Sequence, residues 1–246
     1  MAVDRIKTGV PGLDNVLKGG LRRNSTVLVT GAPGTGKTLL ALEFIYYGAK
    51  DYNENGIFIT TEESLEVLDQ SAKNLGMDIQ GMIKQGKVHV VQKPIATLKG
   101  GLSSIKGLTD AIKKYNIKRA ALDSLIFFEY LYPRLDGNKM EFRRQVLMFM
   151  QQMKDTGVTF VVVSERSVTD FDRLTYDMMD FVFEGIILLS RIRRGSYFER
   201  VLTVAKLRGQ DHSLDVYPIA IGPDGLKVLY DQTPFSLVEK EQTEFK

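Results

Sequence analysis

The stretch TVLVTGAPGTGKT at residues 26–38 decides the fold of this chain. Its first five residues, 26–30, are apolar or β-branched, as expected for a buried strand. Residues 31–38 then match the pattern G-x-x-x-x-G-K-[ST] at every required position, and the mostly apolar run 37–49 predicts a helix behind them. This pattern binds phosphate groups when it lies between a strand and a helix, so the sequence predicts a phosphate-binding loop.

The chemistry of the loop points to ATP or a close relative. The glycines let the backbone curl so that its N–H groups face the phosphates, and the N-terminus of the helix adds its dipole. Lys37 would carry positive charge to the β- and γ-phosphates, and the hydroxyl of Thr38 would ligate Mg²⁺. The residues predicted to bind ATP or ADP are Gly31, Ala32, Pro33, Gly34, Thr35, Gly36, Lys37 and Thr38.

Strand-like and helix-like segments alternate over most of the chain. Further strands are predicted at residues 56–60, 87–91, 119–123 and 158–163, with apolar residues at helical spacing between them. This alternation is typical of a mostly parallel, twisted sheet flanked by helices, with right-handed crossovers. The predicted fold class is therefore α/β.

The alternation of predicted strands and helices ends near Phe181. Strand-like pieces at residues 185–190, 198–206, 215–220 and 226–229 are joined by short turns, which predicts antiparallel hairpins that extend the sheet. We expect one domain over residues 1–246, with the phosphate-loop core at about 24–190 and the hairpins at about 181–230. The polar end of the chain, about 235–246, is expected to be frayed.

Composition excludes several classes of site. The chain has 246 residues, with 33 Lys and Arg against 30 Asp and Glu, and its net charge of +3 does not by itself indicate a nucleic-acid or membrane partner. The absence of cysteine excludes disulfides, thiolate catalysis and zinc–thiolate sites, and only His89 and His212 could offer imidazole. Without a signal-peptide pattern or an apolar run of about 18 residues, we expect a soluble cytoplasmic protein with no membrane partner.

Polar residues follow three of the predicted strands at the edge where the phosphate loop lies. Asp123 ends the fourth strand, where a carboxylate can hold Mg²⁺, usually through water. Glu62 and Glu63 follow the second strand, where a carboxylate can activate the water that attacks the γ-phosphate, or can simply favour the start of the next helix. Ser164 and Glu165 follow the fifth strand and would either sense the nucleotide or cap a loop.

Five ordered motifs resemble the KaiC-like branch of the RecA-type ATPases over nearly the whole chain. The segment TGVPGLDNVLKGGLRRNSTVLVTGAPGTGKT is similar to that family's entry into the phosphate loop. FITTEES resembles the strand that ends in its paired catalytic glutamates, and RAALDSL resembles its Walker-B strand. FRRQVLMFMQQMKDTGVTFVVVSER is similar to the helix and strand that follow, and AKLRGQDHS to its K-x-R-x-x-x-H segment. The turn LKGGLRRNS departs from the family's commoner pattern at an expected surface position.

The resemblance implies a RecA-like fold and roles that spacing alone does not assign. It implies that Glu62 is the general base and Glu63 its partner. It also implies that Lys206 and Arg208 act in trans on the γ-phosphate bound by the neighbouring subunit, and that His212 belongs to the same nucleotide-contacting segment. Self-association follows, as a homohexameric ring with ATP at the subunit interfaces, although a filament also satisfies a head-to-tail interface.

Functions of different classes remain open from the sequence. The leading one is a magnesium-dependent ATPase whose hydrolysis drives a conformational change or partner exchange. A DNA-dependent, recombinase-like ATPase would use the aromatic and basic residues after Asp123 and the arginines between 191 and 200. A nucleotide-sensing scaffold would bind ATP with little turnover, whereas a small-molecule kinase fits the paired glutamates and the antiparallel extension poorly. The protein partner is not identified by the sequence.

Overall fold

The computed structural model describes residues 4–61, 63–92, 101–126, 128, 139–166 and 178–234. In chain order its elements are β1 (Arg5–Ile6), α1 (Leu13–Val16), β2 (Leu21–Arg22), β3 (Thr26–Gly31), α2 (Lys37–Asp51), β4 (Gly56–Thr60), α3 (Leu65–Asn74), α4 (Ile79–Lys84), β5 (Val88–Gln92), α5 (Gly101–Lys114), β6 (Arg119–Asp123), α7 (Lys139–Asp155), β7 (Thr159–Glu165), η3 (Met178–Phe181), β8 (Gly185–Arg194), β9 (Tyr197–Leu207), β10 (Val216–Gly222) and β11 (Gly225–Val228). The predicted base Glu62 and the expected frayed tail lie outside the described residues.

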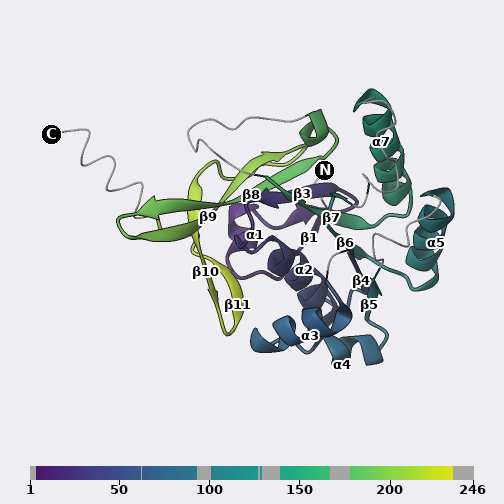
Figure 1. Cartoon of the computed structure of the whole chain (residues 1–246), viewed down its shortest axis with the longest axis horizontal. Helices are drawn as coiled ribbons and strands as arrows, with labels where there is room; N and C mark the ends of the chain where they lie inside the picture. The colour runs from purple at the N-terminus through teal and green to yellow at the C-terminus, as the bar shows by residue number, and fades with distance from the viewer. Residues whose placement is uncertain are drawn as a thin grey trace.

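A nine-stranded sheet forms the centre of the molecule (Figure 1). Its strand order is β11-β10-β9-β8-β3-β7-β6-β4-β5. The strands from β8 to β5 pair in parallel, and β9, β10 and β11 add antiparallel pairs at one edge. The predicted α/β class, with a mostly parallel sheet and an antiparallel C-terminal extension, is confirmed.

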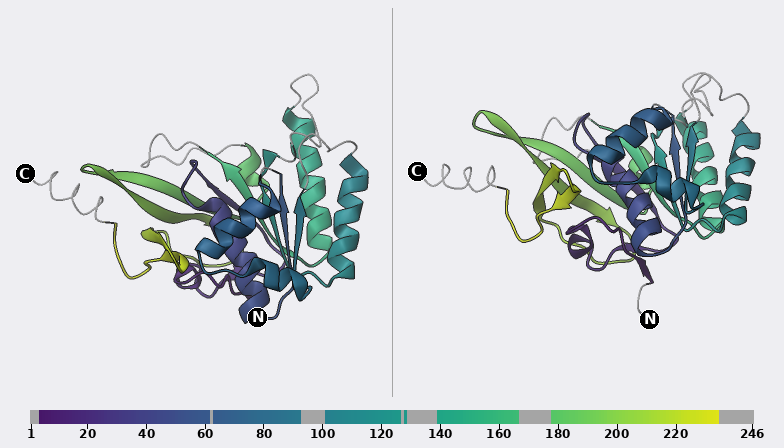
Figure 2. Two further views of the ribbon diagram at one scale, coloured as in Figure 1. Left: turned by 60° about the horizontal axis from the view of Figure 1, so that its bottom comes forward. Right: turned by 90° about the horizontal axis from the view of Figure 1, so that it is seen from below.

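Helices cover both faces of the sheet and enclose two cores (Figures 1 and 2). Successive residues of β3 alternate between them: Val27 and Val29 belong to the core under α2, and Leu28 belongs to the core under α7. Because both faces are covered, the parallel strands are apolar at nearly every position. This explains why β3 reads as a continuous apolar run.

Two helices show how the local sequence pattern is used. On α7, Phe142, Val146, Phe149, Met150 and Met153 follow helical spacing and are buried. Helix α3 ends at Asn74, and Gly76 follows in the left-handed conformation with a φ of 73°.

The hairpin of β8 and β9 is longer than the sequence predicted. Its backbone pairing continues to Arg194 and Tyr197, beyond the predicted end of the first strand at Ser190. The hairpin projects from the body of the molecule (Figure 2), and its residues Arg191, Arg193 and Arg200 are exposed while the backbone groups pair across the two strands.

No helix within the described residues has the length and apolar character needed to span a membrane.

Candidate functional site

The loop between β3 and α2 is shaped by its glycines. A Cβ atom at Gly31 would lie 2.0 Å from the backbone oxygen of Leu189 on the neighbouring strand β8. Gly36, directly before α2, has a φ of 104°, which a residue with a Cβ adopts only at a cost. Within the loop, Thr35 Oγ1 donates a hydrogen bond to the Ala32 oxygen at 2.8 Å. The glycines of the motif are therefore needed to close the loop.

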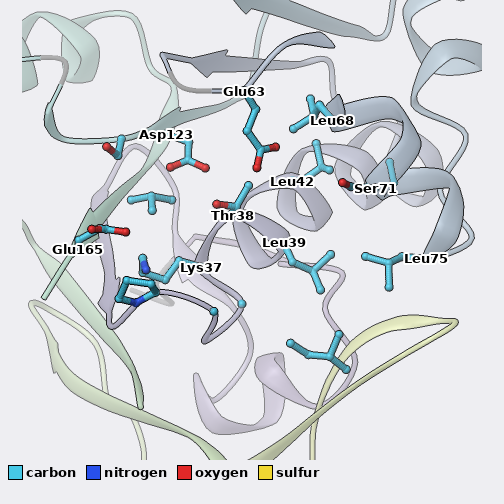
Figure 3. Close-up of a pocket in the computed structure, with 17 residues that line it drawn as sticks. Lys37, Thr38, Leu39, Leu42, Glu63, Leu68, Ser71, Leu75, Asp123 and Glu165 are labelled. Carbon is cyan, nitrogen blue, oxygen red and sulfur yellow. The ribbon is translucent and has the colours of Figure 1, made fainter. Parts of the chain in front are cut away.

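Lys37 and Thr38 begin α2, at the positive end of the helix dipole. The side chain of Lys37 is largely buried, and its Nζ donates a hydrogen bond to the Ala32 oxygen at 3.0 Å. Both residues line a pocket of about 360 Å³ (Figure 3), together with Pro33, Gly34 and Gly36 of the loop.

Carboxylates from the ends of three other strands reach the same pocket. Asp123 ends β6, Glu165 ends β7, and Glu63 follows β4. The carboxyl ends of parallel strands meet at one edge of a sheet, which is where ligands bind in open α/β folds. In Figure 3 the carboxylates of Glu63 and Asp123 and the hydroxyl of Thr38 point toward a common space.

The other side of the pocket is apolar. It is lined by Leu39 and Leu42 of α2, Leu68 of α3, Leu75 directly after α3, and Ile221 of β10. A pocket that is polar at the phosphate loop and apolar beyond it can take the phosphates and the base of one nucleotide.

Hydrogen bonds hold the ends of β4 and β6 together at the pocket. The backbone N–H and the Oγ1 of Thr61 both donate to the backbone oxygen of Asp123, at 2.9 and 3.2 Å. The peptide bond between Asp123 and Ser124 is cis. After Glu62, which lies outside the described residues, the N–H of Glu63 donates to Thr60 Oγ1 at 3.1 Å. The segments on both sides of the predicted base are thus tied to the sheet edge.

The hydroxyl and carboxylate oxygens that line the pocket are of the kind that Mg²⁺ prefers as ligands. This ion prefers hard oxygen ligands, keeps several waters and is commonly shared between one or two carboxylates and the phosphates of a substrate. Thr38 and Asp123 offer a hydroxyl and a carboxylate of this kind. Among the described residues no group of three or more His, Cys, Asp or Glu side chains is placed to hold a metal ion.

Lys206 and Arg208 lie away from this pocket. On the sheet, Lys206 of β9 lies opposite Ile186 of β8, and Ile186 lies opposite Leu28 of β3. Leu28 is three residues before Gly31, where the phosphate loop begins. The Nζ of Lys206 donates to the backbone oxygen of Asp180 at 3.0 Å, and Nη2 of Arg208 donates to the backbone oxygen of Phe181 at 3.4 Å. Burial, and next the charge of Arg208, lower the pKa of Lys206. Lys206 and Arg208 are the predicted finger residues, which would stabilise charge on the nucleotide of a neighbouring subunit. They are close to each other but do not line the pocket of their own chain.

His212 lies beyond the finger residues, after β9. Its ring Nδ1 is 2.8 Å from the Ser213 oxygen, and its backbone N–H donates to Asp211. His212 does not line the pocket of its own chain either.

Sequence reasoning missed three side chains near the site. Arg200 of β9 donates from Nε to the Gly34 oxygen of the phosphate loop at 3.3 Å, and Arg166 pairs with the buried Asp180. Glu43, the third, is fully buried on α2. The only sequence signal for it was one acidic residue within the otherwise apolar run 37–49.

Glu43 is held between α2 and the hairpin of β10 and β11. Its Oε1 accepts a hydrogen bond from the Leu226 N–H at 2.7 Å, while Oε2 is buried without a hydrogen-bond partner among the described residues. Burial raises the pKa of Glu43 from 4.5 to about 8, and the bond from Leu226 opposes this only in part. A carboxyl group in this position is protonated at neutral pH.

We expect Glu43→Gln to remove a pH dependence of stability. The folded protein holds this proton more tightly than the unfolded chain does, so the stabilisation is complete below pH 4.5 and is lost as pH rises toward about 8. Over that window the loss amounts to roughly 3–5 kcal/mol. The unfolding free energy measured in urea at pH 5.5 and pH 8 should therefore fall less in Glu43→Gln than in the unmodified protein. Glu66→Gln, at an exposed site, is the control, and equal pH dependence in Glu43→Gln and the unmodified protein would contradict the assignment.

The comparisons with known proteins agree with this geometry. Residues 6–233 match the family model described as "ATPase: KaiC". The chain is 34% identical to the circadian clock oscillator protein KaiC of Prochlorococcus marinus subsp. pastoris over 236 residues, which cover 93% of this chain and 45% of that protein. It is 32% identical to KaiC of Picosynechococcus sp. over 235 residues, which cover 92% of this chain and 44% of the relative. The chain thus spans about half the length of these curated relatives.

A solved structure matches over nearly its full length. The crystal structure of a KaiC-like protein from the hyperthermophilic archaeon Pyrococcus horikoshii OT3 superposes with a TM-score of 0.79 and 31% identity. The match covers 92% of this chain and 99% of that chain. The similarity therefore includes the phosphate loop, the sheet and the antiparallel extension.

Proposed function

Because this chain belongs to the KaiC family of ATPases, we propose that it hydrolyses ATP with Mg²⁺ at sites shared between the subunits of a homohexameric ring. The observation that carries this proposal is the separation of the site into two parts. One pocket gathers Lys37, Thr38, Glu63 and Asp123, while Lys206 and Arg208 lie outside it on the same chain. A neighbouring subunit that docks over the pocket would bring its own finger residues to the phosphates.

Each part of the pocket has a task in this proposal. The loop N–H groups and Lys37 bind the phosphates, and the apolar wall receives the base. Bound Mg²⁺, held by Thr38 and, through water, by Asp123, would neutralise charge on the β- and γ-phosphates. Glu62, with Glu63 beside it, removes a proton from the attacking water, and the neighbour's Lys206 and Arg208 stabilise the charge that develops on the γ-phosphate. His212 contributes to the nucleotide contact of the same neighbouring segment.

We expect Lys37→Met to abolish ATP-dependent assembly. Methionine keeps the apolar stem of this buried side chain but removes the ammonium group, which should weaken ATP binding about 10- to 100-fold. Light-scattering mass with Mg-ATP, with Mg-ADP and without nucleotide, combined with a phosphate-release assay, tests the proposal. Lys50→Met changes an exposed lysine near the other end of the same helix and should behave as the unmodified protein.

The outcomes separate the proposed function from its alternatives. A ring that forms with ATP and releases phosphate supports the ATPase, whereas a ring without phosphate release indicates a nucleotide-sensing scaffold. A protein that stays monomeric under all three conditions refutes the shared site. Phosphate release by such a monomer would keep the ATPase and refute only the ring.

One observation favours nucleic acid as a further ligand. On the hairpin of β8 and β9, Arg191 lies directly opposite Arg200, and Phe198 beside them is 63% exposed. Like charges opposite each other are unfavourable unless an anion lies between them, and exposed aromatic rings can stack on bases. The loops after Asp123 and Glu165, which the sequence also suggested, lie largely outside the described residues. If single-stranded DNA neither binds in a salt-dependent way nor changes ATP turnover, this alternative is excluded.

A further inference from the structure

The short helix η3 contacts both Arg166, at the end of β7, and the finger residues Lys206 and Arg208. It carries Asp180, which is only 1% exposed and whose carboxylate and backbone oxygen contact different parts of the chain. Its carboxylate oxygens both accept hydrogen bonds from Nη2 of Arg166, and its backbone oxygen accepts a hydrogen bond from Nζ of Lys206. A single buried residue therefore contacts both the end of β7 and a predicted finger.

Arg166 connects this residue to the phosphate loop. Its backbone N–H donates to the oxygen of Gly31, the first residue of the loop, at 3.0 Å. It directly follows Glu165, which lines the pocket and pairs with Gly31 across β7 and β3. A displacement of the loop or of the end of β7 would therefore move Arg166 as well.

Both finger residues are held by backbone oxygens of η3. Lys206 donates to Asp180 and Arg208 donates to Phe181, while the backbone N–H of Arg208 donates to Glu184 at 2.8 Å. The ammonium of Lys206 also lies 5.9 Å from the centre of the Phe181 ring. The position of η3 therefore sets where both cations can reach.

We infer that the ion pair between Arg166 and Asp180 couples the nucleotide site of one subunit to the fingers that this subunit offers to the next. The inference rests on the proposed function, because it requires Lys206 and Arg208 to act in trans. The pair resists separation because its hydrogen bonds are charge-assisted and the carboxylate of Asp180 lies away from water. The end of β7 and η3 should therefore move as one unit when the phosphate loop changes its state. Arg166 and Asp180 are positioning residues in this account, not catalytic ones.

Asp180→Asn gives the sharpest test, because it removes the charge but keeps the backbone oxygen that Lys206 contacts. In the assembled protein we expect ATP turnover to fall at least about tenfold, since fingers supply much larger factors, while ATP affinity changes less than about threefold. Arg166→Ala should act similarly. Arg166→Lys, which keeps the charge but not the forked geometry, should restore part of the turnover.

Non-additivity distinguishes positioning from general support of the fold. If Asp180 acts through both fingers, then adding Asp180→Asn to the variant Lys206→Ala/Arg208→Ala should slow turnover no further. Turnover in the unmodified ring should depend cooperatively on ATP concentration, and Asp180→Asn should bring the Hill coefficient close to one. Lys154→Gln, which removes the neighbouring ion pair with Glu184, is the matched control and should leave both readouts unchanged.

The outcomes also separate this inference from the function on which it rests. If Lys206→Ala leaves turnover intact, the proposed trans role fails and the coupling fails with it. If Lys206→Ala lowers turnover but Asp180→Asn and Arg166→Ala do not, the fingers stand and the coupling alone is overturned. A further loss of turnover when Asp180→Asn is added to Lys206→Ala/Arg208→Ala, or an unmodified ring with no cooperativity, also overturns the coupling.

Discussion

Arg208→Ala is expected to lower the ATP turnover of the assembled protein about a thousandfold or more, with little change in ATP affinity. Arginine fingers contribute factors of about 10³–10⁵ to phosphoryl transfer because they stabilise charge that is present only in the transition state. Arg208 is exposed and lies outside the pocket of its own chain, so its loss should spare the binding site there. Phosphate release and binding of a fluorescent ATP analogue would measure the two effects separately.

Mixed assemblies can show that Arg208 acts in trans. Arg208→Ala subunits keep the predicted base Glu62, and Glu62→Gln subunits, which should still bind ATP and assemble, keep an intact finger, so each variant alone should turn over very slowly. In a one-to-one mixture about a quarter of the interfaces combine the intact base with the intact finger, and activity should return to about that level. A finger acting within its own chain predicts no recovery. Arg144→Ala, at an exposed arginine on α7 that pairs with Glu141, is the control and should turn over normally.

Local patterns explain why the core of the fold could be predicted. The phosphate loop is encoded within eight consecutive residues, and its glycines are required by contacts that the structure shows at Gly31 and Gly36. The parallel strands were recognisable because both of their faces are buried, which makes runs such as Val27–Val29 continuously apolar. Asp123 could be placed at the pocket because it ends a predicted strand of the same sheet and the phosphate loop marks the edge where such strands end.

The remaining features depend on contacts between distant parts of the chain. Lys206 contacts Asp180, 26 residues earlier in the sequence, and no periodicity or motif indicates that pair. Glu43 is buried against Leu226, which is 183 residues away in the sequence, and its carboxyl group accepts a hydrogen bond from the Leu226 N–H. The length of the hairpin was underestimated at Arg191 and Arg193, because strand propensity depends on the partner strand as well as on the residue.

The paired glutamates show where sequence and structure complement each other. The structure places Glu63 in the lining of the pocket, and it ties the backbone of Thr61 and Glu63 to the sheet edge. The assignment of Glu62 as the base comes from the resemblance of FITTEES to the KaiC-like family. The two neighbouring carboxylates therefore have to be distinguished by experiment.

Glu62→Gln is expected to lower ATP turnover by about two to four orders of magnitude while ATP binding and ATP-dependent assembly persist. Glutamine has nearly the same shape as glutamate but cannot accept the proton of the attacking water at neutral pH. The substitution should therefore trap the ring with ATP bound, and phosphate release should be slow at every ATP concentration. A loss caused by weaker binding would instead be relieved by raising ATP.

Glu63→Gln is the matched control, since it makes the same chemical change one residue away in a side chain that lines the pocket. As a partner of the base, Glu63 should contribute less, so the turnover of Glu63→Gln should exceed that of Glu62→Gln. The reverse order would assign the base to Glu63. Equal and small effects of both substitutions would mean that neither carboxylate takes the proton, and the water would then have to be activated by the γ-phosphate itself or by a group from the neighbouring subunit.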